Sequence, residues 1–358
     1  MRPHPSSLLA VDGTPGIANQ SGSEMGTHPI SLLAFRNTPG RISRKPPRYS
    51  GSVYTRRTLL TMAATGFSSL SGAMPRVFAF EQWDVFSKTP LAGNPLAVFL
   101  DARGLTDANM LALARETNLS ETTFIFPPES AERGWRVRIF TRDQELPFAG
   151  HPVLGTANAI RLHMLKPAAR LNLDLNAGII PVEFSSDGYG EMLQPEPIFA
   201  ESHPASKIAP LLGLTEADFD PAHPIKNVST GRPNLIVMLK SLEAVRQAQV
   251  DWPAAARYFA SGDKQRGFYL LTMETNAKSA RLHARKPTRA GDDPVTGSAA
   301  GCAAAYLVDQ GIAKAGERVI IEQGAEVQRP GELYVTASGK EVRVGGYAVR
   351  VFEGRASF

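Results

Sequence analysis

His151-Pro152-Val153-Leu154-Gly155-Thr156-Ala157 is matched 142 residues later by Asp293-Pro294-Val295-Thr296-Gly297-Ser298-Ala299. Five of the seven positions are identical or conservatively matched, and the first position is ionisable in both copies. Each copy follows a glycine-containing turn, and an arginine-containing stretch with strand character lies about a dozen residues before it. Two copies with matching upstream strands predict an internal duplication with a period of about 142 residues.

Each copy has the pattern of a strand, a tight turn and the first turn of a helix. A proline fits this turn because its missing N–H would have no partner there, and the pairs Gly155-Thr156 and Gly297-Ser298 leave backbone N–H groups accessible. Such helix N-termini attract anions. If the two halves pack about a pseudo-two-fold axis, a carboxylate between the termini meets His151 on one side and Asp293 on the other. The alternative is that both segments are ordinary helix starts that match by chance.

From Val77 onwards, stretches with strand periodicity alternate with helical ones. The predicted strands are 77–86, 95–100, 122–126, 135–141, 171–184, 235–239, 267–272, 279–284, 319–322, 332–336, 342–344 and 347–352. The predicted helices are 107–117, 152–162, 242–249, 252–260 and 297–310. We expect an α+β fold of two pseudo-symmetric domains, 76–193 and 194–345, with 346–358 returning to the first. The proline-rich stretch 195–210 is expected to be an irregular crossing between them.

Residues 1–75 differ from the rest of the chain. They are rich in Ser, Gly, Pro and Arg without a helical or strand period, so we expect a disordered extension. Arg56-Arg57 precedes a modestly apolar run that reaches Met74 and ends with small residues, the order of features in a twin-arginine export signal. This run is too short for a membrane span. We expect a periplasmic protein without membrane contact after signal removal; translation from Met74 would instead leave it cytoplasmic.

The positive charge of the chain is concentrated in this extension. The net charge is +5, but residues 1–73 hold eight basic residues against two acidic ones, which leaves about −1 for the rest. The folded part therefore gives no support for a nucleic-acid-binding surface.

The composition also limits the chemistry. Cys302 is the only cysteine, which excludes an intramolecular disulfide, a cysteine-rich metal site and a mechanism with two thiols. The seven histidines show no metal-binding spacing, and the sequence has no glycine-rich phosphate loop. We expect neither a metal nor another cofactor.

Six motifs stand in a characteristic order. They are Asp84-Val85-Phe86, Gly93-Asn94-Pro95-Leu96-Ala97-Val98, Asn118-Leu119-Ser120-Glu121-Thr122-Thr123-Phe124, Arg138-Ile139-Phe140-Thr141, Glu145-Leu146-Pro147-Phe148-Ala149-Gly150-His151-Pro152 and Asp293-Pro294-Val295-Thr296-Gly297-Ser298-Ala299. In order and spacing they resemble the phenazine-biosynthesis PhzF-like family over about residues 78–354. The resemblance implies a diaminopimelate-epimerase-like fold, in which each half wraps antiparallel strands around a central helix. It also implies a cofactor-free isomerase, often a homodimer, with Glu121 as catalytic acid/base and His151, Asp293 and Ser298 around the substrate.

Moving a proton between carbons requires an acid/base group of matched pKa and a way to stabilise the developing charge. Glu121 meets the first need if apolar neighbours raise its pKa; without the family motif, a surface glutamate at a helix end is the better interpretation. His151 and Asp293 orient the substrate or relay the proton. The alternative for His151 is a neutral structural donor at a helix N-terminus. Asp292 competes with Asp293 as the second carboxylate.

The remaining candidates are expected to bind the substrate rather than to react with it. Asn94 either contacts the substrate or only forms a turn with the following proline. Ser120 precedes the acid/base residue, while Gly150, Gly297 and Ser298 belong to the two helix starts.

The resulting expectation is acid/base proton transfer on a small carboxylate, of the trans-2,3-dihydro-3-hydroxyanthranilate isomerase type that the resemblance implies. The alternative is a non-catalytic periplasmic protein that binds a small carboxylate in the same cleft.

Overall fold

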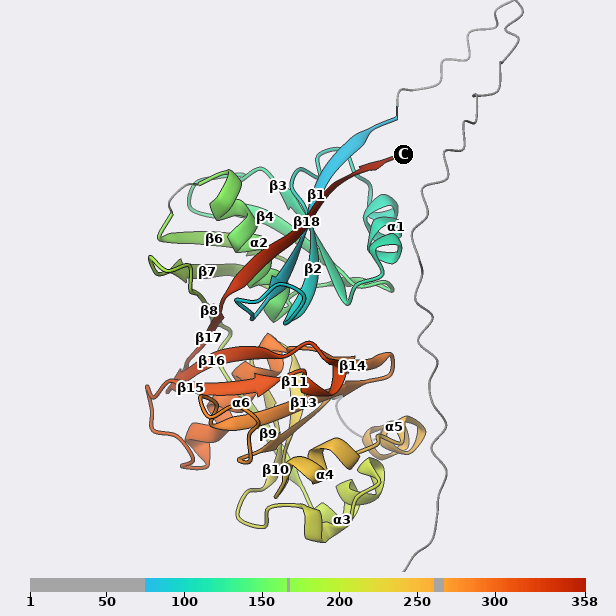
Figure 1. Ribbon diagram of the computed structural model, residues 1–358, viewed down its shortest axis with the longest axis vertical. Coiled ribbons are helices and arrows are strands. Elements are labelled where there is room, and N and C mark those ends of the chain that lie inside the picture. The colour runs from blue at the N-terminus through green and yellow to red at the C-terminus, as the bar shows by residue number, and fades with distance from the viewer. Residues whose placement is uncertain (1–74, 166–167, 261–266) are drawn as a thin grey trace, which may run out of the picture. The chain divides into compact units, whose positions relative to one another are not determined.

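The computed structural model describes residues 75–165, 168–260 and 267–358. These residues belong to one compact unit and form two lobes, which Figure 1 shows one above the other. The candidate export signal around Arg56-Arg57 lies outside the described residues. Within the described ranges, no helix has the length and apolar character needed to cross a membrane.

A sheet of 18 strands runs through the described part of both lobes. The N-terminal lobe holds β1 (Val77–Val85), β2 (Asn94–Phe99), β3 (Glu121–Phe126), β4 (Trp135–Phe140), β5 (Glu145–Leu146), β6 (Arg170–Leu175), β7 (Gly178–Phe184), β8 (Gly190–Gln194) and β18 (Ala348–Ser357). The C-terminal lobe holds β9 (Ile198–His203), β10 (Ile225–Ser229), β11 (Pro233–Met238), β12 (Gly267–Thr272), β13 (Leu282–Thr288), β14 (Gly291–Asp293), β15 (Val319–Gln323), β16 (Gly331–Ser338) and β17 (Glu341–Gly346).

The two lobes repeat one order of strand pairing. The N-terminal lobe runs β18-β1-β2-β3-β4-β6-β7-β8, and the C-terminal lobe runs β9-β10-β11-β12-β13-β15-β16-β17. Each lobe also has one short strand: β5 pairs with β4 in the N-terminal lobe, and β14 pairs with β13 in the C-terminal lobe. The lobes join where β8 pairs antiparallel with β17. The chain therefore crosses twice, once between β8 and β9 and once between β17 and β18.

The α+β class is confirmed, but the sheet is mixed rather than wholly antiparallel. Parallel pairs occur at the same two places in each lobe, β2–β3 with β4–β6 and β11–β12 with β13–β15. Parallel neighbours require a crossover connection, usually a helix. Helix α1 (Asp107–Thr117) joins β2 to β3, and α4 (Leu242–Gln247) with α5 (Trp252–Phe259) lies between β11 and β12. The central helices make the other two crossovers.

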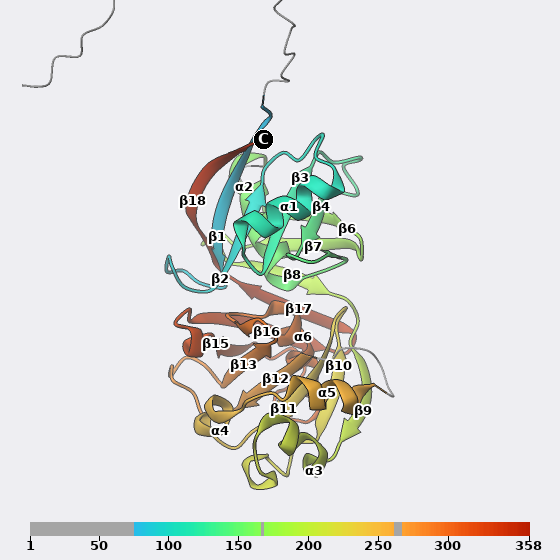
Figure 2. The same cartoon turned by 90° about the vertical axis from the view of Figure 1, so that its right-hand side faces the viewer.

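Those central helices are α2 (Gly150–His163) and α6 (Gly297–Asp309), and strands surround both (Figures 1 and 2). Helix α2 is buried over its first 11 residues, 150–160, and α6 over its first 11, 297–307. Helix α6 is built almost entirely from Gly, Ala, Ser and Cys over 297–305, so strands can pack closely around it. One continuous core connects the helices of both lobes.

The register of the duplication differs from the sequence match. The β4 hairpin pairs Ile139 with Leu146, and the β13 hairpin pairs Lys286 with Asp293, which sets the structural period at 147 residues. Helices α2 and α6 begin at the same offset. The predicted period of 142 was therefore wrong by five residues, because Pro294 lies before its helix whereas the first proline lies inside the first turn of α2.

The stretch 195–210 is more regular than predicted. It contains the exposed strand β9 and the short helix α3 (Ala205–Ile208). Strand β10 was also missed. Strand β9 has six exposed or half-buried residues, so it lacks the alternation of apolar and polar positions that reveals a strand in sequence.

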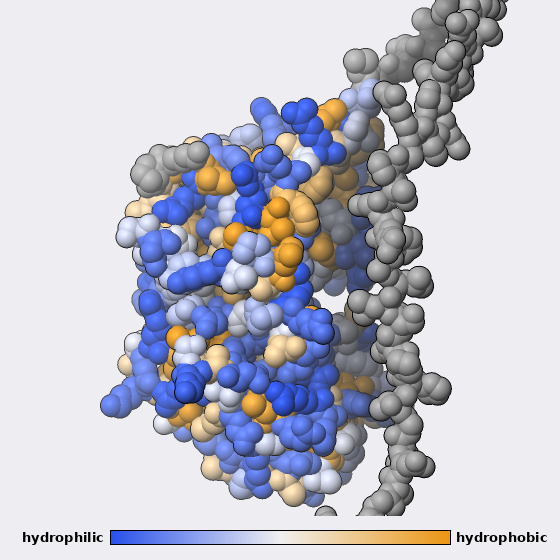
Figure 3. Space-filling model, viewed as in Figure 1, coloured by the Kyte–Doolittle hydropathy of each residue, from blue (hydrophilic) through white to orange (hydrophobic). Residues whose placement is uncertain are grey.

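The face drawn in Figure 3 is mostly hydrophilic, with hydrophobic side chains scattered among polar ones. This distribution is ordinary for an exposed protein surface.

Candidate active site

The N-termini of α2 and α6 meet at two glycines. Gly150 is the first residue of α2, and Gly297 is the first residue of α6. A Cβ atom on Gly150 would lie 2.6 Å from the backbone nitrogen of Ser298 and 2.7 Å from the carbonyl carbon of Gly297. A side chain here would overlap the backbone of the other helix. The structure thus places Gly150 of α2 against Gly297 and Ser298 of α6.

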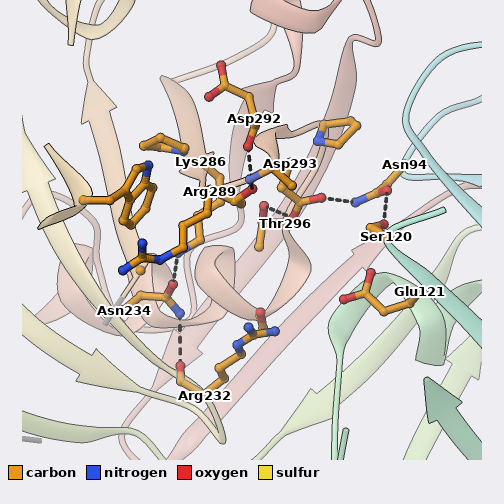
Figure 4. Close-up of a pocket in the computed structure, with 18 of the residues that line it drawn as sticks. Asn94, Ser120, Glu121, Arg232, Asn234, Lys286, Arg289, Asp292, Asp293 and Thr296 are labelled. Carbon is orange, nitrogen blue, oxygen red and sulfur yellow. Dashed lines mark hydrogen bonds between the residues drawn. The ribbon is translucent and has the colours of Figure 1, made fainter. Parts of the chain in front are cut away.

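A cavity of about 800 Å³ lies beside this contact, and both lobes line it. The N-terminal lobe contributes Asn94, Ser120 and Glu121. The C-terminal lobe contributes Arg232, Asn234, Trp252, Phe259, Lys286, Asp292, Asp293, Thr296 and Ser298. In Figure 4, Asn94 and Glu121 lie across from Asn234 and Lys286, with Asp293 and Thr296 between the two pairs.

Glu121 is the first residue of β3 and follows directly on the loop that leaves α1. Its side chain is 12% exposed, and its Oε2 lies 3.5 Å from Nε2 of His151. Burial raises the pKa of Glu121, against the lowering effects of the Ser120 hydroxyl and the Arg232 charge. The carboxyl group therefore holds a proton more readily than a glutamate in water.

His151 is the second residue of α2 and is buried. Burial lowers its pKa to about 4, although the charge of Asp293 acts in the opposite direction. The imidazole is therefore neutral near pH 7, and its 3.5 Å approach to Glu121 is not an ion pair there. Nε2 is buried and has no hydrogen-bond partner among the described residues.

Asp293 lies at the end of β14 and is held by both lobes. Asn94 donates a hydrogen bond from Nδ2 to Oδ1 of Asp293 at 2.8 Å, and the Thr296 hydroxyl donates to Oδ2. Burial raises the pKa of Asp293, and the negative charge of Glu121 raises it further. Two carboxyl groups with raised pKa values thus share one desolvated site and titrate as a pair.

The contacts separate the alternatives for Asn94 and for the two neighbouring aspartates. Asn94 is fully buried; it also donates to the Val295 carbonyl at 2.7 Å, and it accepts from the Ser120 hydroxyl at 3.4 Å. It is therefore a cross-link between the lobes and more than a turn residue.

Asp292 forms an ion pair with Arg285 at 2.8 Å, which leaves Asp293 as the carboxyl group that interacts with Glu121.

Lys286 and Arg232 were missed from the sequence. Strand 279–284 was predicted to end before Lys286, whereas β13 continues to Thr288. Lys286 is buried, and its ammonium group donates to Oδ1 of Asn234. The residues after Ala284, Arg285-Lys286-Pro287-Thr288, show no alternation of apolar and polar side chains, so the sequence carried no strand signal at this lysine.

The arrangement is suited to acid/base chemistry. The carboxyl groups of Glu121 and Asp293 line one cavity, and the neutral imidazole of His151 lies 3.5 Å from Glu121. The nearby helix N-termini provide N–H donors for an anion. Within the part of the chain that the structure describes, no cluster of His, Cys, Asp or Glu is placed to hold a metal ion.

Acidification is expected to destabilise the fold through His151. Its pKa is near 6.5 in the unfolded chain and about 4 in the fold, so the folded state binds fewer protons and loses stability as the pH falls through this range. The loss from this group is about 2 kcal/mol between about pH 7 and pH 5. Glu121 and Asp293 shift the other way, so the measurement is the difference in unfolding free energy between the wild type and His151→Asn. Equal acid sensitivity in both proteins would contradict a buried neutral imidazole.

Comparison with known proteins adds to this picture. The family model of phenazine biosynthesis-like proteins matches residues 83–354. The trans-2,3-dihydro-3-hydroxyanthranilate isomerase of Pseudomonas aeruginosa is 35% identical over 290 residues, which cover 76% of this chain and 97% of that protein. The crystal structure of a Bacillus anthracis phenazine biosynthesis protein of the PhzF family is 28% identical with a TM-score of 0.70, covering 78% of this chain and 99% of that one. A hydroxyproline epimerase from Agrobacterium vitis, 12% identical with a TM-score of 0.53 over 79% of this chain and 93% of that one, is similar in fold alone.

Proposed function

The chain belongs to the phenazine biosynthesis-like protein family and is an isomerase, and we propose that it moves a proton within a small carboxylate substrate without a cofactor. Glu121 removes the proton from one carbon and returns it to another. The observation that carries the proposal is the enclosed approach of Glu121 to the neutral His151, with Asp293 facing the same cavity.

The other residues support this reaction by binding and orientation. The substrate carboxylate lies near the N-termini of α2 and α6, where backbone N–H groups and helix dipoles favour negative charge. The same donors stabilise the charge that develops when the carbon loses its proton. His151 Nε2, which lacks a protein partner in the described residues, orients the substrate beside Glu121.

We propose a cyclic carboxylate related to trans-2,3-dihydro-3-hydroxyanthranilate, the compound in the names of the isomerases from Pseudomonas. Trp252 and Phe259 line the cavity and provide apolar surface for a ring. In this proposal the enzyme is exported by the signal at Arg56-Arg57 and acts as a homodimer.

A screen for solvent hydrogen exchange tests the reaction class. The full-length protein is incubated with a panel of cyclic carboxylates in D2O, and incorporation of deuterium into each compound is followed by mass spectrometry. We expect deuterium to enter at least one compound of the panel, because the transferred proton equilibrates with solvent on Glu121. Tight binding without exchange would favour the alternative, a non-catalytic periplasmic protein that binds small carboxylates.

A further inference from the structure

Two basic side chains, Arg232 and Lys286, lie on the cavity wall opposite Glu121. Figure 4 shows Arg232, Asn234 and Lys286 on the side of the C-terminal lobe, across from Glu121. Among the described residues, neither Lys286 nor the Arg232 guanidinium forms an ion pair. Lys286 is 9% exposed and uses one N–H for Asn234, which leaves two donors of its ammonium group unused. A buried cation without an anion is costly, so this wall is suited to an anionic ligand.

The pseudo-symmetry relates this wall to the one that carries Glu121. Glu121 begins β3 and pairs with Leu96 of the parallel strand β2, while Gly267 begins β12 and pairs with Asn234 of the parallel strand β11. The antiparallel registers of β3 with β4 and of β12 with β13 also make Glu121 and Gly267 equivalent positions. The position of the acid/base residue in one lobe is therefore a glycine in the other.

Lys286 occupies the space that this glycine leaves open. A Cβ atom on Gly267 would overlap Nζ of Lys286 and would lie 3.1 Å from its Cε. The ammonium group thus lies at the start of β12, where the other lobe has a carboxyl group at the start of β3. The two walls of the cavity present opposite chemistry, a proton-carrying carboxyl group on one side and cations on the other.

We propose that Lys286 and Arg232 form a second anion-binding subsite, which takes a second carboxylate of the substrate and selects dicarboxylates over monocarboxylates. The proposal rests on the proposed function, because it requires the substrate to lie in this cavity with its reacting carbon near Glu121. The subsite is separate from the helix N-termini, which hold the first carboxylate. Charge-assisted hydrogen bonds from Lys286 and Arg232 to this group are the strongest that the wall offers.

The charge of the subsite depends on pH. Burial lowers the pKa of Lys286 to about 7, and the charge of Arg232 acts in the same direction, while Asp293 and Cys302 oppose them. Lys286 is therefore charged below this pH and neutral above it. The preference for a second carboxylate should decline as the pH rises through this range.

Calorimetric titration of the full-length protein with benzoate and with benzene-1,3-dicarboxylate at about pH 6 tests the subsite. We expect the wild type to bind the dicarboxylate about 10-fold more tightly than benzoate. Lys286→Met keeps the side-chain length without the charge, so it should remove this preference. Arg232→Gln, at an exposed position, should reduce the preference and gives a result even if the first variant does not fold. Lys340→Met, whose side chain is 81% exposed, is the matched control.

The outcomes separate the subsite from the proposed function. A preference that is absent from the wild type, or that persists in both variants, overturns the subsite, while benzoate binding leaves the proposed function standing. Failure of both ligands to bind overturns the small-carboxylate site itself and the subsite with it. The preference in the wild type should also fall between about pH 6 and pH 9. If Lys286 only linked β13 to β11 through its hydrogen bond to Asn234, the preference would not depend on pH in this way.

Discussion

Glutamine in place of Glu121 is expected to lower the rate of solvent deuterium exchange by about 10²- to 10⁴-fold. The substitution keeps the volume and a hydrogen-bonding end, but an amide cannot carry the proton between two carbons. The neighbouring His151, 3.5 Å away, has a pKa lowered to about 4 and is therefore too weak a base to replace the lost carboxylate. The rate is measured by mass spectrometry on the compound that exchanges with the wild type.

The matched control is Glu116→Gln, an exposed glutamate on α1, which precedes β3 in the chain. This variant should exchange deuterium at the rate of the wild type. The affinity of Glu121→Gln for the carboxylate should change little, because in the proposed reaction the anion binds at the helix N-termini. Unchanged exchange in Glu121→Gln would remove this residue from the mechanism.

The sequence was informative where local chemistry decides the structure. Thr106 caps α1 with a reciprocal capping box, and Asn118 ends this helix in the left-handed conformation, so both ends could be predicted from single residues. The start of α6 at Gly297 was predicted for a similar reason, whereas α2 begins at Gly150, two residues before the predicted start at Pro152. The duplication followed from these two starts.

The sequence was less informative where two distant segments decide the structure together. The hydrogen bond from Asn94 to Asp293 joins residues 199 positions apart, and no local pattern assigns Asn94 to this role. Lys286 is buried only because Gly267, on the neighbouring strand, leaves room for its ammonium group. The similarity of the two heptapeptides also concealed the true register, because the prolines that dominate the match lie on different sides of the two helix starts.

The contact between α2 and α6 is a distant determinant of this kind, because the candidate site is assembled from both lobes. Glu121 and Asn94 come from the N-terminal lobe, while Asp293 and Ser298 come from the C-terminal lobe. The site exists only if the lobes hold one fixed separation, and backbone atoms set this separation at Gly150.

Alanine in place of Gly150 is accordingly expected to damage stability and activity together. Its Cβ atom would lie 2.6 Å from the backbone nitrogen of Ser298, an atom that cannot rotate away, so α2 and α6 must separate. We expect a loss of about 2–3 kcal/mol in the free energy of unfolding, typical of overpacking, despite the higher helix propensity of alanine. Displacement of the facing groups by about 1 Å should lower deuterium exchange by about 100-fold. Chemical denaturation and the exchange assay measure the two effects.

Gly311→Ala is the comparison that isolates the steric overlap. Gly311 has a φ of +69° and no atom within 4 Å of its ideal Cβ, so alanine there costs backbone strain of about 1–2 kcal/mol and leaves the site intact. Exchange should therefore survive in Gly311→Ala and be lost in Gly150→Ala at comparable stability. If Gly150→Ala retained full exchange, the helix N-termini would not need to touch for the reaction. The carboxylate would then have to be held by side chains of the cavity alone.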